Sequence, residues 1–355
     1  MLNNMRMMNT GTRIVAGIGM ALLAGSAMAG NPNRAGSAGA TQLLVNPWAR
    51  SSGWSLANSA SLVGAEGLFG NVAGLAHVRK TELLFTTTRW LEGSGVKVNA
   101  VGFGQKVGDS GVLGITATTF SFGELPVTTV DQPEGGLGTF SPTQANIGLA
   151  YSKAFSNSIF GGLLVRVVSE SIANAKTSGI CFDAGIQYVT GPSDNIHFGI
   201  ALKNVGPAMH FSGDGISVQG MLTGSDNTLT LEQRSADFEL PSMMNIGAAY
   251  DINISELHRV TVAGTFVSNS FTKDQFALGA EYAFKKMVHV RAGYLYEKNI
   301  GDKELRETVF TGPSAGISVD LPFGEEKKSA VAIDYGYRAT NPFNGVHSIG
   351  VRLSL

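Results

Sequence analysis

Apolar and polar residues alternate along most of the chain after residue 80. In the segment "MVHVRAGYLYE", one parity carries Val288, Val290 and Tyr294, and the other carries His289 and Arg291. The same period recurs in "CFDAGIQY", "FALGAEYAF" and "AVAIDYGYR". Because successive side chains of a strand point to opposite faces, this pattern predicts strands with one apolar and one charged face. Aromatic residues near the strand ends add the signature of a transmembrane barrel, with lipid outside and a polar lumen inside.

The chain contains fourteen such segments, mostly of about ten to thirteen residues, which suits tilted membrane strands. The predicted fold is therefore all-β, a 14-stranded antiparallel transmembrane β-barrel. A soluble sandwich or propeller with one wet face also alternates and is the competing interpretation. The predicted strands begin near residues 81, 95, 111, 146, 158, 177, 194, 240, 256, 274, 287, 310, 327 and 345.

The connections between these strands form two sets of different length. Alternate connections such as "VGDSG", "FSNS" and "FKK" are short, whereas the opposite set includes 123–145, 206–240 and 299–309. Outer-membrane barrels have short periplasmic turns and long outer loops. An even strand count places both ends of the barrel on one side, which this topology makes periplasmic. The final strand, "SIGVRLSL", resembles the terminal strand read by barrel-assembly machinery, although it ends in Leu355 rather than an aromatic residue.

The N-terminus predicts export. Arg6 and Arg13 precede the apolar run "IVAGIGMALLAG", and a small-x-small pattern ends at Ala29. These are the features of a cleaved secretory signal peptide covering residues 1–29, with a mature chain beginning at Gly30. A retained membrane helix is the alternative, but the run is shorter than the roughly 20 residues that span a bilayer. We therefore expect a protein of the Gram-negative outer membrane, in contact with its lipid.

The composition and motifs of the sequence argue against several classes of function. The net charge of −1 argues against nucleic-acid binding, which normally needs a basic footprint. The single cysteine, Cys181, excludes an internal disulfide framework. No pair of histidines has the helix-face spacing of a metal site. We predict no catalytic residue, no metal and no cofactor, hence not an enzyme. The scattered histidines are His77, His197, His210, His258, His289 and His347.

Residues 30–80 precede the first strand and are too apolar for a flexible tail, since they include Leu43, Trp48, Trp54 and Phe69. A fourteen-stranded barrel is wider than the eight strands whose lumen side chains can fill. We therefore predict that residues 30–80 form a hatch folded into the lumen from the periplasmic side, and that residues 81–355 form the barrel.

The charged residues of the strands are predicted to face the lumen, because a basic residue facing lipid at the midplane costs about 2–4 kcal/mol. Both signs are interspersed, which favours an ion-paired network that holds the hatch to the wall over a binding site for an acidic ligand. The residues are Arg166, Lys203, Arg259, Arg291, Arg338 and Arg352, with Glu170, Asp183, Glu281 and Asp334.

The turn before the first strand carries a recognisable motif. "LFGNVAGLA" is similar to the Asn-Pro-Ala-Gly-Leu hatch motif of the fatty-acid transporter superfamily of outer-membrane barrels, with Val72 in place of proline. The hatch motif residues here are Asn71, Val72, Ala73, Gly74 and Leu75.

Longer blocks resemble the PorV/PorQ family, among them "AGLAHVRKTELLFTTTRWL", "VTTVDQPEGGLGTFSPTQANIGLAYSKAF", "RVVSESIANAKTSGICFDAGIQYVTG" and "GIALKNVGPAMHF". The likeness covers about residues 49–210. It implies a part in the type IX secretion system, in which such barrels bind C-terminal signal domains of secreted cargo, the translocon barrel or the attachment-complex proteins. Whether the chain is PorV-like or PorQ-like stays open.

One outer loop carries apolar residues where water is expected. In "GELPVTTVDQPEGGLGTFSP" these are Leu125, Val127, Leu137 and Phe140, on a chain stiffened by prolines. They form a candidate partner-binding site, with packing back over the barrel mouth as the alternative. Two functions remain: a non-enzymatic secretion component, or a gated transporter for long-chain fatty acids or other hydrophobic small molecules. A solid lumen would favour the first, and a continuous apolar pocket the second.

Overall fold

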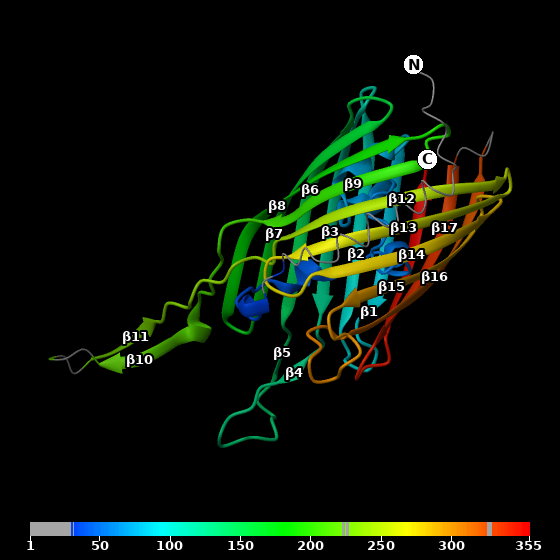
Figure 1. Ribbon diagram of the computed structural model, residues 1–355. Coiled ribbons are helices and arrows are strands. Elements are labelled where there is room, and N and C mark those ends of the chain that lie inside the picture. Colours follow the sequence, from blue (N-terminus) through cyan, green and yellow to red (C-terminus); the bar gives the residue numbers. More distant parts are fainter. Residues whose placement is uncertain (1–29, 31, 222–223, 225–226, 325–328) are drawn as a thin grey trace, which may run out of the picture.

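The computed structural model is a closed antiparallel barrel of fourteen strands (Figure 1). It describes residue 30 and residues 32–221, 224, 227–324 and 329–355; the predicted signal peptide lies outside the described residues. The barrel strands are β1 (Thr81–Arg89), β2 (Lys97–Val107), β3 (Gly111–Ser121), β6 (Thr143–Ala154), β7 (Ile159–Ile172), β8 (Ala175–Thr190), β9 (Ile196–Val205), β12 (Met243–Ser255), β13 (His258–Asn269), β14 (Gln275–Phe284), β15 (Val288–Glu297), β16 (Phe310–Phe323), β17 (Ser329–Thr340) and β18 (Val346–Ser354).

Each strand pairs with its neighbours in chain order, and β1 closes the barrel against β18, from Glu82 opposite Ser354 to Arg89 opposite His347. Every barrel strand begins within three residues of its predicted start, so the fold prediction is confirmed. Within the described residues, no helix is long and apolar enough to cross a membrane.

The outward face of the barrel is apolar, because the alternate residues that face away from the lumen remain exposed. In β1 the outward Leu83 and Phe85 are 43% and 47% exposed, whereas the inward Leu84 and Thr86 are 1% exposed. Such a surface cannot face water over a whole barrel without association, and in lipid it needs no further cover.

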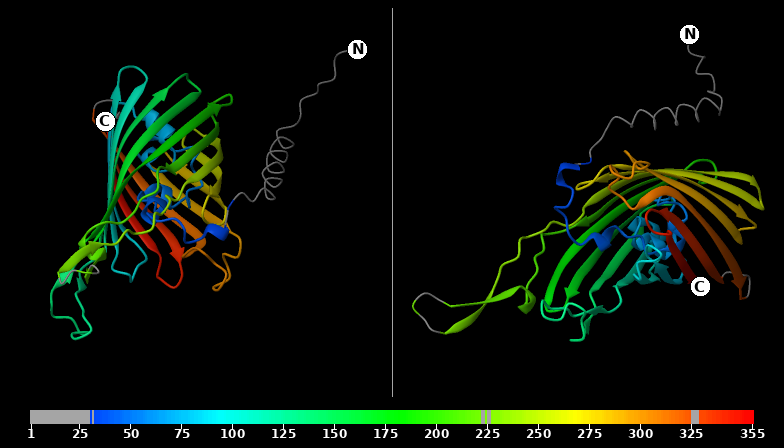
Figure 2. Two further views of the ribbon diagram at one scale, coloured as in Figure 1. Left: turned by 90° about the vertical axis from the view of Figure 1, so that its left-hand side faces the viewer. Right: turned by 90° about the horizontal axis from the view of Figure 1, so that it is seen from below.

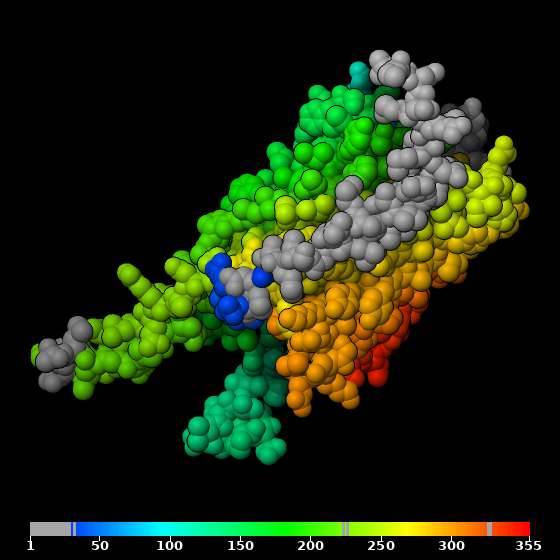
Figure 3. Space-filling view, in the orientation of Figure 1, coloured from blue at the N-terminus to red at the C-terminus, as the bar shows by residue number. Residues whose placement is uncertain are grey.

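The two ends of the barrel differ. One end, called here the short-turn end, has the connections 108–110, 155–158, 191–195, 256–257 and 285–287. The other end, the long-loop end, has the connections 122–142, 206–242 and 298–309, together with shorter ones. Two hairpins inside the long loops were not predicted: β4 (Leu125–Pro126) with β5 (Thr139–Phe140), and β10 (Ser217–Met221) with β11 (Thr228–Glu232). Both project from the barrel as separate arms (Figures 1 and 3).

Residues 40–78, the lumen segment, lie inside the barrel (Figure 2). They form short helical turns because a chain of small and apolar residues without alternation has no strand partner in the lumen. These turns are η3 (Thr41–Leu44), α2 (Ala49–Ser52), η4 (Gly64–Leu68) and η5 (Val72–His77); η2 (Pro32–Arg34) precedes them, and η6 (Asp214–Ile216) lies in a long loop. Trp48, Leu68 and Leu75 pack against inward residues of the wall in one apolar cluster.

The path of this segment differs from the prediction in one respect. The predicted hatch, residues 30–80, does not enter and leave the lumen at the short-turn end alone. Residue 80 joins β1 at that end, but Gly30 contacts Asp274 in the connection 270–274, at the long-loop end. The segment therefore runs the length of the lumen.

Candidate functional site: the lumen cavity

The hatch motif residues seat the lumen segment on β8. Asn71 precedes η5, where its Oδ1 accepts a hydrogen bond from the Ala73 amide at 3.1 Å, and its Nδ2 donates to the Ile186 carbonyl at 3.2 Å. Val72, Ala73, Gly74 and Leu75 form the buried turn that follows. A Cβ on Gly185 would overlap Asn71 Oδ1, so glycine in the wall lets this side chain approach the strand.

A cluster of charges joins the lumen segment to the wall in the short-turn half of the barrel. The Glu281 carboxylate lies 2.6 Å from Arg291 Nε, 3.3 Å from an Arg259 nitrogen and 3.4 Å from His289 Nδ1. Arg50 of the lumen segment lies 3.7 Å from the same carboxylate. One buried anion thus holds several cations, which keeps four elements of the chain in fixed positions.

Two further pairs lie along the wall. Arg166 is bound to Asp183 at 2.5 Å and donates to Asn204 Oδ1 at 2.7 Å. Arg352 lies 3.2 Å from Asp320. The prediction of an ion-paired network therefore holds for Arg166, Arg259, Arg291 and Arg352, although most pairs join strand to strand rather than hatch to wall.

Lys203 and Arg338 do not fit that prediction. They are 3% and 6% exposed, yet among the described residues neither has a carboxylate within ion-pair distance. Each cation lies over an aromatic ring instead: Lys203 Nζ is 3.6 Å from the ring centre of Phe69, and Arg338 Cζ is 3.5 Å from that of Phe310. A ring face offsets only part of the cost of burying a full charge.

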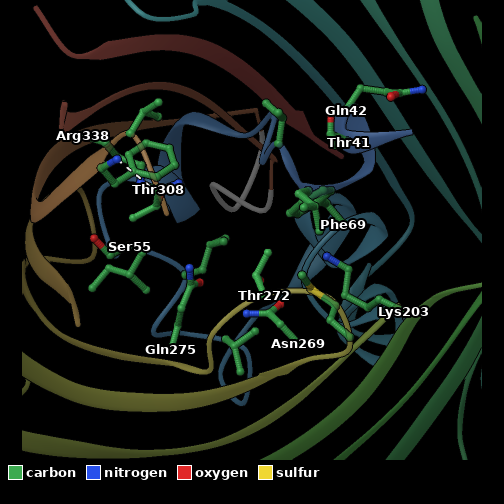
Figure 4. A pocket seen from close by; sticks show the side chains of 18 of the residues that line it. Thr41, Gln42, Ser55, Phe69, Lys203, Asn269, Thr272, Gln275, Thr308 and Arg338 are labelled. Atoms are coloured by element: carbon green, nitrogen blue, oxygen red, sulfur yellow. Dashed lines mark hydrogen bonds between the residues drawn. The ribbon is translucent and has the colours of Figure 1, made fainter. Parts of the chain in front are cut away.

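Both cations line a cavity of about 600 Å³ in the long-loop half of the lumen (Figure 4). Its floor is the lumen segment, and its wall is formed by the long-loop ends of the strands. This volume lies in the range of pockets that enclose a small organic molecule. Apolar lining residues are Leu44, Val45, Leu56, Leu62, Phe69, Trp90, Val96, Phe120, Phe122, Met243, Val267, Leu295, Val309 and Phe310.

The lumen cavity shares lining residues with two smaller spaces. Asn58 and Leu62 also line a cavity of about 130 Å³ toward the short-turn end. Met243 also lines a recess of about 220 Å³, which includes the outward-facing Leu202 and Met244. The lumen cavity thus shares lining residues with one space toward the short-turn end and with one recess at the side of the barrel.

The predicted loop residues lie in the β4–β5 hairpin, away from the lumen cavity. Leu125 and Phe140 are paired across the hairpin; Leu125 and Leu137 are 41% and 52% exposed, while Val127 and Phe140 are half-buried. The hairpin projects from the barrel end and does not cover its mouth (Figure 1).

Within the described residues, no group of three or more His, Cys, Asp or Glu is placed to hold a metal ion. His197 lies 3.2 Å from Asp251, and the Cys181 thiol is fully buried. The sequence did not indicate that the rings of Phe69 and Phe310 would lie against Lys203 and Arg338. It also did not indicate that Arg338 would have no counter-ion among the described residues, because these contacts depend on which segments lie side by side.

A closed barrel with an apolar outer face and a lumen partly filled by its N-terminal segment defines the class of outer-membrane barrels. The structure is similar to the monoaromatic hydrocarbon channel CymD, with a TM-score of 0.51 and 13% identity over 87% of this chain and 96% of that one.

Weaker similarities link it to a Pseudomonas aeruginosa FadL homologue (TM-score 0.49, 11% identity, 86% and 96% of the chains) and to the Pseudomonas putida toluene transporter TodX (0.48, 13%, 83% and 93%). No protein-family model and no curated protein matches the sequence. At 13% identity the likeness to CymD shows the fold alone.

Proposed function

We propose that this barrel binds hydrophobic molecules with an acidic head group in the lumen cavity and passes them across the outer membrane. The observation that carries the proposal is the cavity itself: its lining is largely apolar, and Arg338 supplies a buried charge without a carboxylate partner among the described residues. A solid lumen would have argued against transport. The similarity to a hydrocarbon channel, CymD, accords with a hydrophobic cargo.

The charged residues of the lining are Lys203, Arg338, Glu297 and Glu307. Glu307 is paired with Lys273, and Glu297 accepts a hydrogen bond from Gln275. The two cations are therefore the groups that can receive an acidic ligand.

A carboxylate bound near Arg338 would accept charge-assisted hydrogen bonds from the guanidinium, while a hydrocarbon chain would lie on the apolar lining. Lys203 offers a second position on the opposite wall of the cavity (Figure 4). Release would require movement at Asn58 and Leu62 or at Met243, which line both the lumen cavity and a neighbouring space.

Equilibrium binding of radiolabelled palmitate to the purified barrel, held in a polymer belt free of detergent, tests the proposal. A hydrogen bond to a charged group contributes about 1.5–3 kcal/mol, so Arg338→Met should weaken palmitate binding by about ten- to a hundredfold. Binding of hexadecanol, which has no charge, should change little. The matched control is Arg89→Met, since Arg89 is 73% exposed at the same end of the barrel. Unchanged palmitate binding by Arg338→Met, or none by the parent protein, would refute the proposal.

A second candidate function is a part in type IX secretion, and the projecting hairpins favour it. The β4–β5 hairpin exposes Leu137, and the β10–β11 hairpin places Val218 beside Leu231 on one exposed face. Such arms suit contact with the translocon barrel, the attachment-complex proteins or cargo signal domains. If the β4–β5 hairpin binds a partner, Leu137→Ser with Phe140→Ser should preserve barrel levels and remove co-purifying barrels or cargo. Full retention of these partners would move the contact elsewhere.

A further inference from the structure

The N-terminal residues of the described chain are held at the rim of the long-loop end. The Gly30 backbone nitrogen donates a hydrogen bond to Asp274 Oδ2 at 2.7 Å. Asp274 is only 6% exposed, and its other carboxylate oxygen lies 3.2 Å from the Asn269 amide, which donates to it. Because the Asn269 amide holds the Asp274 carboxylate in place, this carboxylate is already oriented to accept a hydrogen bond from residue 30.

The position of residue 30 is also sterically specific. A Cβ on Gly30 would lie 2.8 Å from the Asp274 nitrogen, from Asp274 Oδ1 and from the Thr272 carbonyl oxygen. Two of these three atoms belong to the backbone of the 270–274 connection and cannot move aside cheaply. The site therefore accepts glycine and excludes any larger residue.

Residues 30–39, called here the rim segment, have further contacts with the long loops. Arg34 lies 2.5 Å from Glu239 and 4.3 Å from the ring centre of Phe271. The Gly39 amide donates to the Glu239 carbonyl at 3.0 Å. The rim segment thus contacts both the connection 270–274 and the loop 206–242.

We propose that Asp274 is the binding site for the mature N-terminal ammonium group and that signal cleavage completes it. Signal peptidase uses water to hydrolyse the peptide bond between Ala29 and Gly30; the new carboxylate leaves with residues 1–29, and the amino group stays on Gly30. At neutral pH this amino group is largely protonated. One neutral amide donor thereby becomes a cation beside a buried carboxylate, and a charge-assisted hydrogen bond is about twice as strong as a neutral one.

The site has a consequence for the lumen cavity. The rim segment leads directly into Thr41 and Gln42, which line that cavity together with Asn269 and Thr272 (Figure 4). An N-terminus fixed at Asp274 therefore holds one side of the cavity in place, and a chain with its leader still attached does not gain this ion pair. Any effect of this contact on transport through the cavity rests on the proposed function, whereas the ammonium site itself does not.

The test uses the mature barrel isolated from outer membranes. Mass spectrometry should find Gly30 as the first residue. Competitive labelling with isotopic acetic anhydride across pH, read on the tryptic peptide that ends at Arg34, then gives the pKa and reactivity of the terminal amine. An ordinary α-amino group has a pKa of about 7.7–8.0, and a close carboxylate raises it by about one unit or more. We expect labelling at pH 7.5 to be at least about sevenfold slower than in the boiled protein.

Asp274→Asn keeps an acceptor for the Asn269 amide but removes the charge, so it should return the amine to its ordinary pKa and reactivity. Gly30→Ala should do the same through overlap with Thr272 and Asp274. Asp131→Asn, in the exposed loop of the β4–β5 hairpin, is the matched control and should change nothing. Each variant is first checked for its shift in gel mobility on boiling, which reports an intact barrel.

A different mature N-terminus, or an amine with the same pKa in the parent protein and in Asp274→Asn, would overturn the proposal. Because none of these measurements involves a transported molecule, they can fail or succeed independently of the proposed function.

Discussion

Replacing Glu281 by glutamine should destabilise the barrel more than any exposed charge change. Glu281 is 3% exposed, and its carboxylate is shared by Arg291, Arg259, His289 and Arg50. Glutamine keeps the volume and one acceptor but removes the negative charge, which leaves buried cations facing one another. Removing one partner of a buried ion pair costs about 3–5 kcal/mol, and we expect a loss of this size in the free energy of unfolding.

The assay is denaturant unfolding of the barrel in lipid vesicles, followed by tryptophan fluorescence. Trp48 and Trp54 are buried inside the lumen and report loss of the native interior. Glu256→Gln, in the exposed β12–β13 turn, is the matched control and should stay within about 0.5 kcal/mol of the parent. The double variant Glu281→Gln with Arg291→Gln should lose less than the sum of its two single variants, because the two residues interact directly. A loss below about 1 kcal/mol for Glu281→Gln would show that these charges do not depend on one another.

Three further outcomes follow from the lumen segment. Deleting residues 30–76 while keeping the signal should leave a barrel that conducts ions in planar bilayers, since the lumen is too wide for its own side chains; conductance equal to that of the intact protein would contradict a plug. Gly185→Val should displace Asn71 and increase leak conductance, whereas Gly264→Val, on the outward face, should not. Burial raises the pKa of the Glu66 carboxyl from 4.5 to about 7, so the folded chain keeps a proton that the unfolded chain releases. The free energy of unfolding should therefore fall as pH rises from about 4.5 to about 7, and Glu66→Gln should remove this dependence.

The strands could be read from the sequence because their cause is local. Lipid on one side and a polar lumen on the other impose a period of two on every strand, whatever its neighbours are. The inward direction of Arg166 and Arg338 followed from the same parity. The apolar content of residues 30–80 indicated a segment inside the lumen, and the alternation missed the β10–β11 hairpin because that arm is not part of the wall.

Only the tertiary structure decided which residues contact each charged side chain that faces the lumen. Arg166 stands opposite Cys181 on β8, and Asp183 comes two residues further along that strand, within reach. Arg338 stands opposite Ser314 on β16 and Val346 on β18, so its guanidinium turns to Phe310 and the cavity. Both arginines have the same place in the alternating pattern. Strand register and the path of the lumen segment place a carboxylate beside Arg166, whereas no carboxylate of the described residues lies within ion-pair distance of Arg338.

The contact between Gly30 and Asp274 depends on the fold in the same way, because it joins residues 244 positions apart. Composition and spacing determined that this chain forms a membrane barrel with a filled lumen. Long-range packing determined where that lumen stays open, and which charges face the space.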